Sequence, residues 1–276
     1  MASIKAWLRL FRTGNCVIIG LASATGYFLG GGRDPVITLL VGLASALVAA
    51  GGNSINDYFD HAIDLVNKPW RPLPSGQISP RTALIVSLVS TGLGVVVGYL
   101  ISPLCGLIAS IAALVLYAYS SELKKSGFWG NVIIASLSAL SVLYGGLAAP
   151  RPELSFFPAG YAFLIILGRE ILKGLEDYEG DKFAGVNTVA ITRGPRTAVL
   201  AGSAILLSVV FMSPIPLLLG YDVMYGVFAL LGVDLPIIAS IAYVWRDPLE
   251  RGWRATRLLK IPLLSGLLAF LVGTLG

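Results

Sequence analysis

Long apolar runs, separated by short polar or turn-rich segments, follow one another along almost the whole chain. A membrane-spanning helix needs about 20 mostly apolar residues. The pattern predicts an all-α, polytopic membrane protein with about nine transmembrane helices. The expected spans are residues 16–31, 36–55, 82–101, 104–119, 130–148, 156–172, 198–214, 223–245 and 258–275.

The composition supports a membrane location. Of the 276 residues, 56% are hydrophobic and 13% are charged, whereas about a quarter of the residues of a soluble domain carry charge. So few charges cannot cover the surface of a water-soluble globule of this size. The composition therefore excludes a water-soluble globular enzyme, and it equally excludes a disordered chain or a disulfide scaffold.

The basic residues predict the topology. If nine helices span the membrane, all 20 Lys and Arg residues except Arg33 and Arg151 fall on the side of the N-terminus. The positive-inside rule then places the N-terminus and the long loops in the cytoplasm and the C-terminus outside. This bias also explains the net charge of +5 without a nucleic-acid partner. The basic, amphipathic N-terminal segment is interpreted as a surface helix rather than a signal peptide.

The first of two acidic segments follows the second expected span. Asn56, Asp60 and Asp64 are spaced by four residues. If the helix continues, these side chains line one face over about 12 Å. Asp57 flanks that face.

The second acidic segment follows the sixth expected span and repeats the spacing with Asp177 and Asp181. Like charges at this spacing destabilise a helix, so a cation is expected among them. Hard oxygen ligands without His or Cys favour Mg²⁺, which completes its shell with water and substrate phosphates. The two segments together therefore predict a site for a metal-bound diphosphate.

Basic residues near these segments fit an anion site. Lys68 and Arg71 lie in a proline-rich loop, and Arg71 is the better phosphate ligand because a guanidinium binds with two donors. Lys124 and Lys125 either reach a phosphate or act only as a topological signal. Asp234 falls within a span, where it is either functional or a helix cap beside Pro236.

At these motifs the chain resembles the UbiA superfamily of intramembrane prenyltransferases. The superfamily motif N-x-x-x-D-x-x-x-D is matched by Asn56, Asp60 and Asp64, and the motif D-x-x-x-D by Asp177 and Asp181. Arg12 and Asn15 match the entry motif of the first span. Within the superfamily, residues 56–60, 67–76 and 169–177 are similar to the archaeal digeranylgeranylglyceryl phosphate synthases.

The resemblance implies a UbiA-like bundle with cytoplasmic cap loops, formed as a single transmembrane domain by residues 1–276. It implies Mg²⁺-dependent transfer of a geranylgeranyl group from its diphosphate to the hydroxyl of geranylgeranylglyceryl phosphate in the membrane. The implied metal ligands are Asn56, Asp60, Asp64, Asp177 and Asp181, and the four aspartates and Lys124 are the implied catalytic residues. The implied substrate-binding residues are Arg12, Asn15, Asn56, Asp57, Lys68, Arg71, Tyr119, Glu170 and Lys173.

Three alternatives remain open at this stage. An aromatic prenyltransferase, making a quinone, chlorophyll or haem precursor from an acceptor such as 4-hydroxybenzoate, shares the first half-reaction. A CDP-alcohol phosphotransferase also uses metal-binding aspartates, but its pattern D-x-x-D-G-x-x-A-R is absent because His61 and Ala62 follow Asp60. A secondary transporter places acids in a bundle near the membrane midplane, whereas here they cluster at helix ends, with Asp234 as the exception.

Overall fold

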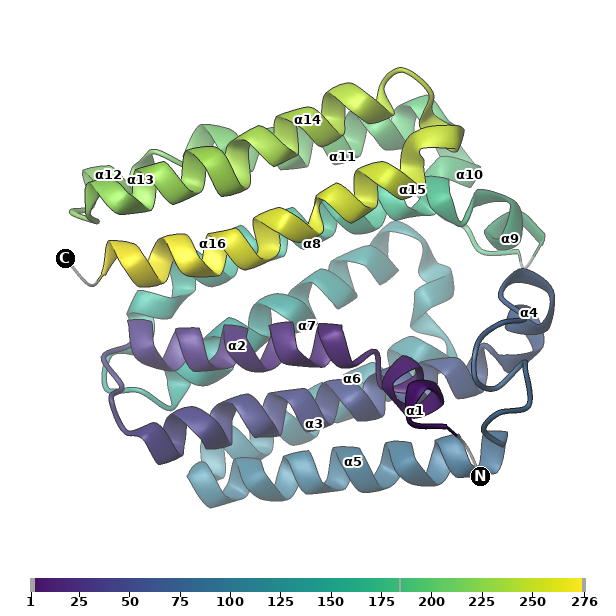
Figure 1. The fold of residues 1–276 in the computed structure, drawn as a ribbon, viewed down its shortest axis with the longest axis horizontal. Coiled ribbons are helices and arrows are strands. Elements are labelled where there is room, and N and C mark those ends of the chain that lie inside the picture. The colour runs from purple at the N-terminus through teal and green to yellow at the C-terminus, as the bar shows by residue number, and fades with distance from the viewer. Residues whose placement is uncertain (1–2, 184, 275–276) are drawn as a thin grey trace. The chain divides into compact units, whose positions relative to one another are not determined.

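The computed structural model describes residues 3–183 and 185–274, and every regular element in this part of the chain is a helix (Figure 1). The chain forms two compact units. The N-terminal unit comprises Met1–Leu123 and Ser141–Ser155, and the C-terminal unit comprises Lys124–Leu140 and Phe156–Gly276. Helix α7 (Phe128–Leu147) contributes its first part to the C-terminal unit and its last part to the N-terminal unit.

Three long helices of the N-terminal unit begin at a proline that follows a capping side chain. Asp34, Ser79 and Ser102 each accept a hydrogen bond from a backbone N–H in the first turn of the helix that follows. Proline suits this position because its missing N–H has no partner there. The helices are α1 (Ile4–Leu10), α2 (Thr13–Leu29), α3 (Pro35–Phe59), α4 (His61–Asn67), α5 (Pro80–Ile101) and α6 (Pro103–Ser121), followed by the 3-10 turn η2 (Pro152–Ser155).

Helix α3 lies at the centre of this unit and contacts α2, α5 and α6. Its contact with α5 is close. A Cβ added to Gly94 would lie 2.9 Å from the carbonyl oxygen of Ala44, and the Ser87 hydroxyl donates to the carbonyl of Gly51 at 2.8 Å. Small residues that let two backbones approach and hydroxyls that bond across helices are typical of packing in lipid.

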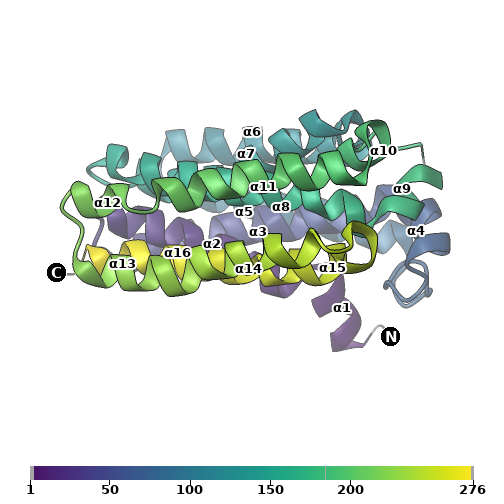
Figure 2. The same ribbon diagram turned by 90° about the horizontal axis from the view of Figure 1, so that it is seen from above.

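The C-terminal unit is built around α8 (Phe156–Glu176), which contacts α11 (Pro195–Met212) and α15 (Pro248–Leu258). Figure 2 shows its long helices lengthwise. The other elements are the 3-10 turn η1 (Leu123–Ser126), α9 (Tyr178–Phe183), α10 (Val189–Arg193), α12 (Ile215–Leu218), α13 (Val223–Ala229), the π-helical turn η3 (Leu230–Asp234), α14 (Leu235–Val244) and α16 (Lys260–Gly273).

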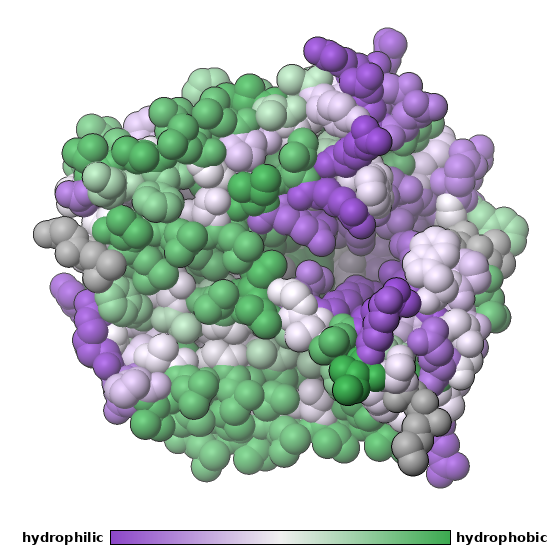
Figure 3. Space-filling model, viewed as in Figure 1, coloured by the Kyte–Doolittle hydropathy of each residue, from purple (hydrophilic) through white to green (hydrophobic). Residues whose placement is uncertain are grey.

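The helices confirm a protein that crosses the membrane many times. Eight helical segments in the described part of the chain are long and apolar enough to cross a membrane, and α2 is a shorter apolar helix. Together they correspond to the nine expected spans. Many large apolar side chains are exposed, among them Leu100, Leu114, Phe211 and Leu218. On the face seen in Figure 3, hydrophobic residues cover α5 and α16, as expected for surfaces that lie against lipid.

Asp234 occupies the N-cap position of α14, but its side chain does not cap that helix. It ends the π-turn η3, and its side chain makes no capping hydrogen bond to α14. Instead, one carboxylate oxygen accepts a hydrogen bond from the Ser213 hydroxyl at 2.9 Å. Asp234 is only 8% exposed, so the residue predicted beside Pro236 takes the cap position while its side chain belongs to a buried polar contact inside the C-terminal unit.

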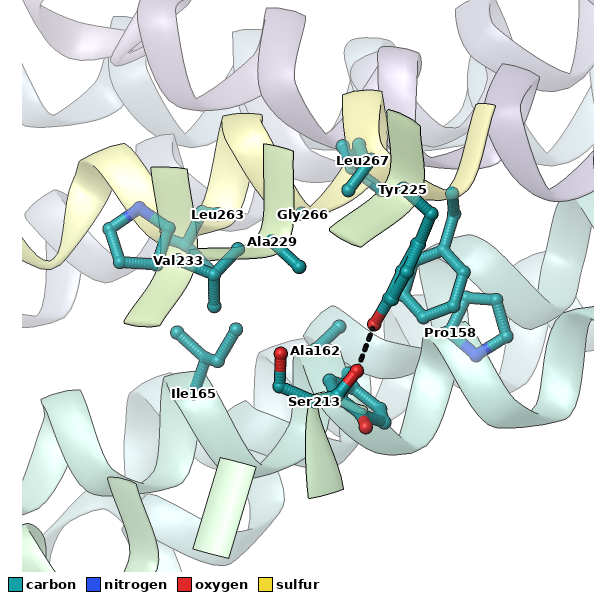
Figure 4. Close-up of a pocket in the computed structure, with 14 residues that line it drawn as sticks. Pro158, Ala162, Ile165, Ser213, Tyr225, Ala229, Val233, Leu263, Gly266 and Leu267 are labelled. Atoms are coloured by element: carbon teal, nitrogen blue, oxygen red, sulfur yellow. Dashed lines mark hydrogen bonds between the residues drawn. The ribbon is translucent and has the colours of Figure 1, made fainter. Parts of the chain in front are cut away.

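A small cavity lies beside Ser213, among α8, α13 and α16 (Figure 4). Its volume is about 30 Å³ and its walls are almost entirely apolar, with Ile165, Val233 and Leu263 among them. A cavity of this size holds one or two water-sized groups. It is too small for a prenyl chain, and on α8 it lies about 20 Å from the second acidic motif at 1.5 Å per residue. The cavity is therefore separate from the second acidic motif.

Candidate functional site

The first acidic motif lies where α3 passes into α4. Asp60 separates the two helices, yet its N–H bonds to the carbonyl of Asn56 at 2.9 Å and its carbonyl accepts from the N–H of Asp64 at 2.8 Å. Helical hydrogen bonding thus continues through the motif, which keeps residues four apart on one face. The Asn56 amide also donates to a carboxylate oxygen of Asp60 at 2.9 Å and orients it.

Two arginines bind the carboxylates of this region. Arg12 lies 2.7 Å from Oδ1 of Asp57, and Arg71 lies 3.4 Å from the same oxygen. Arg71 also bonds to Oδ2 of Asp64 at 2.5 Å. The Asp57 and Asp64 side chains are only 3% and 5% exposed. The fold therefore gathers four of the predicted residues, Arg12, Asp57, Asp64 and Arg71, into one ion-pair network.

Packing of α1 explains how these arginines reach the motif. Ala6 and Leu10 of α1 are buried together with Leu73, which lies in the proline-rich loop after α4, and with Ile78, which follows that loop. Arg12 follows α1 in a left-handed conformation (φ 49°) that turns the chain into α2. A left-handed residue other than Gly is uncommon and costs energy, so it persists only where its surroundings hold it.

The pKa values of Asp64 and Arg71 in this network are both raised, but for different reasons. Burial raises the pKa of the Asp64 carboxyl, and the neighbouring Arg71 offsets only part of that rise. Burial acts to lower the pKa of Arg71, but Asp57 and Asp64 outweigh it, so the guanidinium has a raised pKa and stays charged. Arg71 is therefore a permanent positive charge at the first motif.

The donor set of the first motif fits a hard cation. Asn56, Asp60 and Asp64 offer only oxygen ligands, the type that Mg²⁺ prefers. In the described part of the chain, however, no three His, Cys, Asp or Glu side chains form a group that could hold a metal ion. The chemistry of the residues thus agrees with Mg²⁺, while the assignment of metal ligands stays a prediction.

The second acidic motif begins at the end of α8. Asp177 follows the last residue of that helix, Asp181 lies in α9, and the Asp181 N–H bonds to the Asp177 carbonyl at 2.8 Å. Lys173 lies 3.8 Å from the Asp177 carboxylate and 3.6 Å from that of Glu170. Glu170, Lys173 and Asp177 therefore share one face of α8.

Arg169 is a member of this region that the motif spacing did not identify as a site residue. Its guanidinium bonds to Glu170 at 2.6 Å and donates through Nε to the backbone carbonyl of Thr256 at 3.3 Å. The Thr256 hydroxyl donates to Glu176 at 2.8 Å. These bonds tie α8 to α15. The sequence carried a signal for Arg169, because the segment 169–177 that shows the family resemblance begins at this residue, but no site role was assigned to it.

The predicted basic loop lies against the segment that follows α9. Lys124 and Lys125 are in η1, and Gly127 follows with a positive φ of 64°. A Cβ added to Gly127 would lie 1.9 Å from the carbonyl oxygen of Asn187, so only glycine allows this approach. Both segments belong to the C-terminal unit, so the fold holds the Lys124 loop close to the chain of the second motif.

The remaining predicted residues lie at helix ends. Asn15 is in the first turn of α2, and its N–H bonds to the Arg12 carbonyl at 2.7 Å. Lys68 ends α4, and its carbonyl accepts from the N–H of Arg71 at 2.9 Å. Tyr119 lies in the last turn of α6. Their roles as ligands stay predictions.

Comparison with known proteins shows what this chain is similar to. Residues 17–264 match the UbiA prenyltransferase family. The chain is 39% identical to the digeranylgeranylglyceryl phosphate synthase of Metallosphaera sedula, covering 99% of this chain and 96% of the relative. It is 35% identical to the synthase of the same name from Saccharolobus solfataricus, covering 99% of this chain and 98% of the relative.

Solved structures show the same fold. One described as concerning digeranylgeranylglyceryl phosphate synthase in membranes is 35% identical, covers 99% of each chain and superposes with a TM-score of 0.75. A UbiA homologue from Archaeoglobus fulgidus, bound to GPP and Mg²⁺, is 20% identical with a TM-score of 0.68 and covers 97% of this chain and 100% of its own. These likenesses confirm an all-α, polytopic fold.

Proposed function

The chain belongs to the UbiA prenyltransferase family, and from this premise we propose that it transfers a geranylgeranyl group from geranylgeranyl diphosphate to the hydroxyl of geranylgeranylglyceryl phosphate. The observation that supports this proposal is similarity over nearly full length to relatives that are named digeranylgeranylglyceryl phosphate synthase. The product is a lipid with two geranylgeranyl chains, formed as in archaeal ether-lipid synthesis. Residues 1–276 act as one prenyltransferase domain in this proposal.

Both acidic motifs take part in binding the donor diphosphate in this proposal. Asn56, Asp60 and Asp64 of the first motif, with Asp177 and Asp181 of the second, are the oxygen ligands that would hold Mg²⁺. An ion held by these ligands would supply the positive charge that offsets the charge developing on the leaving diphosphate. Arg71, Lys68 and Lys124 add fixed positive charge, and Arg71 can bind two phosphate oxygens at once. Arg12 and Asn15 complete the donor site through the network around Asp57.

The allylic carbon–oxygen bond then breaks, and the diphosphate leaves with the bonding electrons. The allylic cation needs an environment without water, which apolar helices supply. Tyr119, in the last turn of α6, is placed where a polar helix end meets the apolar span, and its ring face can stabilise a cation.

The acceptor hydroxyl attacks the allylic carbon, a new carbon–oxygen ether bond forms, and the hydroxyl proton passes to the departing diphosphate. In the proposal Glu170 accepts a hydrogen bond from that hydroxyl. The Glu170 carboxylate is only 13% exposed and its oxygens lie 2.6 Å from Arg169 and 3.6 Å from Lys173, so these contacts hold it in place to accept that hydrogen bond and orient the hydroxyl.

The protein is a multi-pass membrane protein, and we propose that the N-terminus and both motif loops face the cytoplasm while the C-terminus faces outside. The distribution of Lys and Arg supports this orientation, because only Arg33 and Arg151 fall on the opposite side. Cysteine accessibility in right-side-out vesicles tests it with single cysteines at Ser121 and Glu153, on opposite predicted sides. Labelling of the Ser121 variant before that of the Glu153 variant would reverse the orientation.

The function is tested with purified protein, Mg²⁺ and labelled geranylgeranyl diphosphate. Geranylgeranylglyceryl phosphate and 4-hydroxybenzoate are offered in parallel. The proposal predicts a labelled dialkyl lipid phosphate and no aromatic product. If only the aromatic acceptor gave a product, the proposed lipid acceptor would be wrong and the protein would be an aromatic prenyltransferase. If no acceptor led to release of diphosphate, the proposal of prenyl transfer would be wrong.

A further inference from the structure

Three basic side chains from three helices gather at one end of the C-terminal unit. They are Arg169 of α8, Arg257 near the end of α15 and Lys260 at the start of α16. Lys260 lies within electrostatic reach of Arg169, Arg257 and Glu176. Hydrophilic residues cover α15 in Figure 3, in contrast to the apolar surface along α16. None of the three residues belongs to either acidic motif, although Arg169 forms an ion pair with Glu170 beside the second motif.

Close packing of α15 against α8 positions the cluster. A Cβ added to Gly252 would lie 3.0 Å from the Cβ of Leu175 and 3.3 Å from the backbone nitrogen of Glu176. Further along the same contact, Arg169 donates to the Thr256 carbonyl at 3.3 Å. The Arg169 side chain is only 19% exposed, so its direction is fixed by this contact rather than by solvent.

The nearby acids neutralise the cluster only in part. Glu170 binds Arg169, and Glu176 accepts a hydrogen bond from the Thr256 hydroxyl. The Arg257 guanidinium lies 3.8 Å from the centre of the Trp253 ring, and within residues 3–183 and 185–274 neither Arg257 nor Lys260 forms an ion pair. Cations held this close repel one another, so the cluster favours a bound anion.

We propose that Arg169, Arg257 and Lys260 bind the phosphate of the acceptor lipid. The inference rests on the proposed function, which requires a lipid phosphate as acceptor. A phosphate monoester carries a charge of about −1.5 to −2 at neutral pH and offers three oxygens. Arginine binds two of those oxygens and lysine adds a point charge, which matches the composition of the cluster.

The spacing along α8 agrees with this assignment. Arg169 and Asp177 are eight residues apart and the backbone bond from Asp177 to Lys173 continues the helix, which gives about 12 Å between them. In the acceptor, the phosphate and the reacting hydroxyl are on neighbouring carbons. The hydroxyl must come within about 3–3.5 Å of the allylic carbon that carries the diphosphate. A phosphate at Arg169 and a diphosphate at Asp177 therefore bracket the two reacting atoms.

The test uses Lys260→Gln, Arg257→Gln and the double variant in nanodiscs of neutral lipid. With geranylgeranyl diphosphate saturating, each single variant should raise the KM for geranylgeranylglyceryl phosphate about tenfold, and the double variant more, because each removes a charged contact. The KM for the donor should stay within about twofold. Lys260→Arg should restore acceptor binding, because the positive charge remains.

Two controls distinguish a loss of phosphate recognition from a general loss of activity. Arg254→Gln removes the same charge from α15, but Arg254 contacts Tyr243 and lies outside the cluster. It should leave the acceptor KM unchanged. Geranylgeranylglycerol, which lacks the phosphate, should be used equally poorly by the parent protein and by the double variant. A melting temperature measured for each variant reports on folding.

Direct binding of labelled geranylgeranylglyceryl phosphate without donor distinguishes this inference from the proposed function. If the parent protein binds the lipid and the double variant does not, the phosphate site stands even where transfer to this acceptor fails. Equal binding by both proteins would overturn the site. So would a variant effect that appears only when anionic lipid is added to the nanodisc, because the cluster would then bind the membrane surface.

Discussion

In the first acidic motif two arginines bind the carboxylates directly, whereas in the second a partly exposed lysine lies at a longer distance. Asp57 and Asp64 are almost fully buried, with guanidinium contacts as short as 2.5 Å. Asp177 is 22% exposed and lies 3.8 Å from Lys173, itself 40% exposed. The first motif is therefore part of the folded framework of the N-terminal unit, and the second is a more adaptable surface of the C-terminal unit.

Aspartates at the same four-residue spacing can therefore differ in how much their ion pairs contribute to stability. A buried ion pair is strongly destabilised when one partner is removed, whereas an exposed pair contributes little. Substitutions in the first motif should thus affect both stability and activity, and those in the second should affect mainly activity.

The largest expected effect is loss of turnover in Asp60→Ala and in Asp181→Ala. Each removes a proposed metal ligand, so the leaving diphosphate loses its counter-charge, and the rate of transfer should fall about a thousandfold or more. Product formation from labelled geranylgeranyl diphosphate measures it, with size-exclusion chromatography as the check on folding. If both folded variants kept their activity, the metal site would have to be placed elsewhere.

The next largest effect is a loss of stability in Asp57→Asn, beside the first motif, that a change in the second motif should not cause. Asp57→Asn leaves Arg12 and Arg71 close together without their shared carboxylate. Because Asp57 is buried but both arginines are partly exposed, we expect a loss of about 2–4 kcal/mol in the free energy of unfolding. Thermal unfolding in detergent measures it. Glu179→Gln, an exposed change within the second motif, is the matched control and should shift the melting temperature by less than 2 °C. Equal shifts would remove the contrast.

Arg71→Gln should have a smaller effect that appears in binding. The variant loses the positive charge that contacts Asp57 and Asp64, and with it a two-donor ligand for phosphate. The KM for geranylgeranyl diphosphate should rise about tenfold, corresponding to one lost charged contact. Arg71→Lys keeps the positive charge but loses the two-donor geometry of the guanidinium, so it should recover only part of the affinity for the donor. Full recovery would mean that charge alone matters here.

The smallest expected change is the stability of Lys173→Met. Lys173 is 40% exposed, so loss of its contacts with Glu170 and Asp177 should lower the free energy of unfolding by less than about 1 kcal/mol. The same thermal assay measures it against Asp57→Asn. A loss as large as that of Asp57→Asn would show that the second motif is as much a part of the folded framework as the first.

Much of the fold was predictable because each membrane span can be recognised from one continuous run of apolar residues. Each apolar run of about 20 residues became a helical segment, and the repeat of four from Asn56 to Asp64 survived as continuous hydrogen bonding across the junction of α3 and α4. Helix ends were less predictable. The second expected span stopped at Ile55, but α3 continues to Phe59, because Asn56, Asp57 and Tyr58 are tolerated where a helix leaves the apolar layer.

The ion-pair network was not predictable, because it depends on contacts between distant segments. Asp57 was placed beside the acidic face, but only the packing of α1 on the loop after α4 brings Arg12 and Arg71 to one of its oxygens. Arg169 was missed for the same reason. Its partner is the backbone carbonyl of Thr256, 87 residues away, and a carbonyl leaves no mark in a sequence.

The most direct test of the account is Mg²⁺-dependent binding of a geranylgeranyl thiolodiphosphate, an analogue that does not react. In the proposed function, carboxylates of both motifs bind one metal-bound diphosphate. Mg²⁺ should therefore strengthen binding to the parent protein and to Glu179→Gln, and this gain should disappear in both Asp60→Asn and Asp181→Asn. A full Mg²⁺-dependent gain in either aspartate variant would contradict the account, because one motif would then be sufficient.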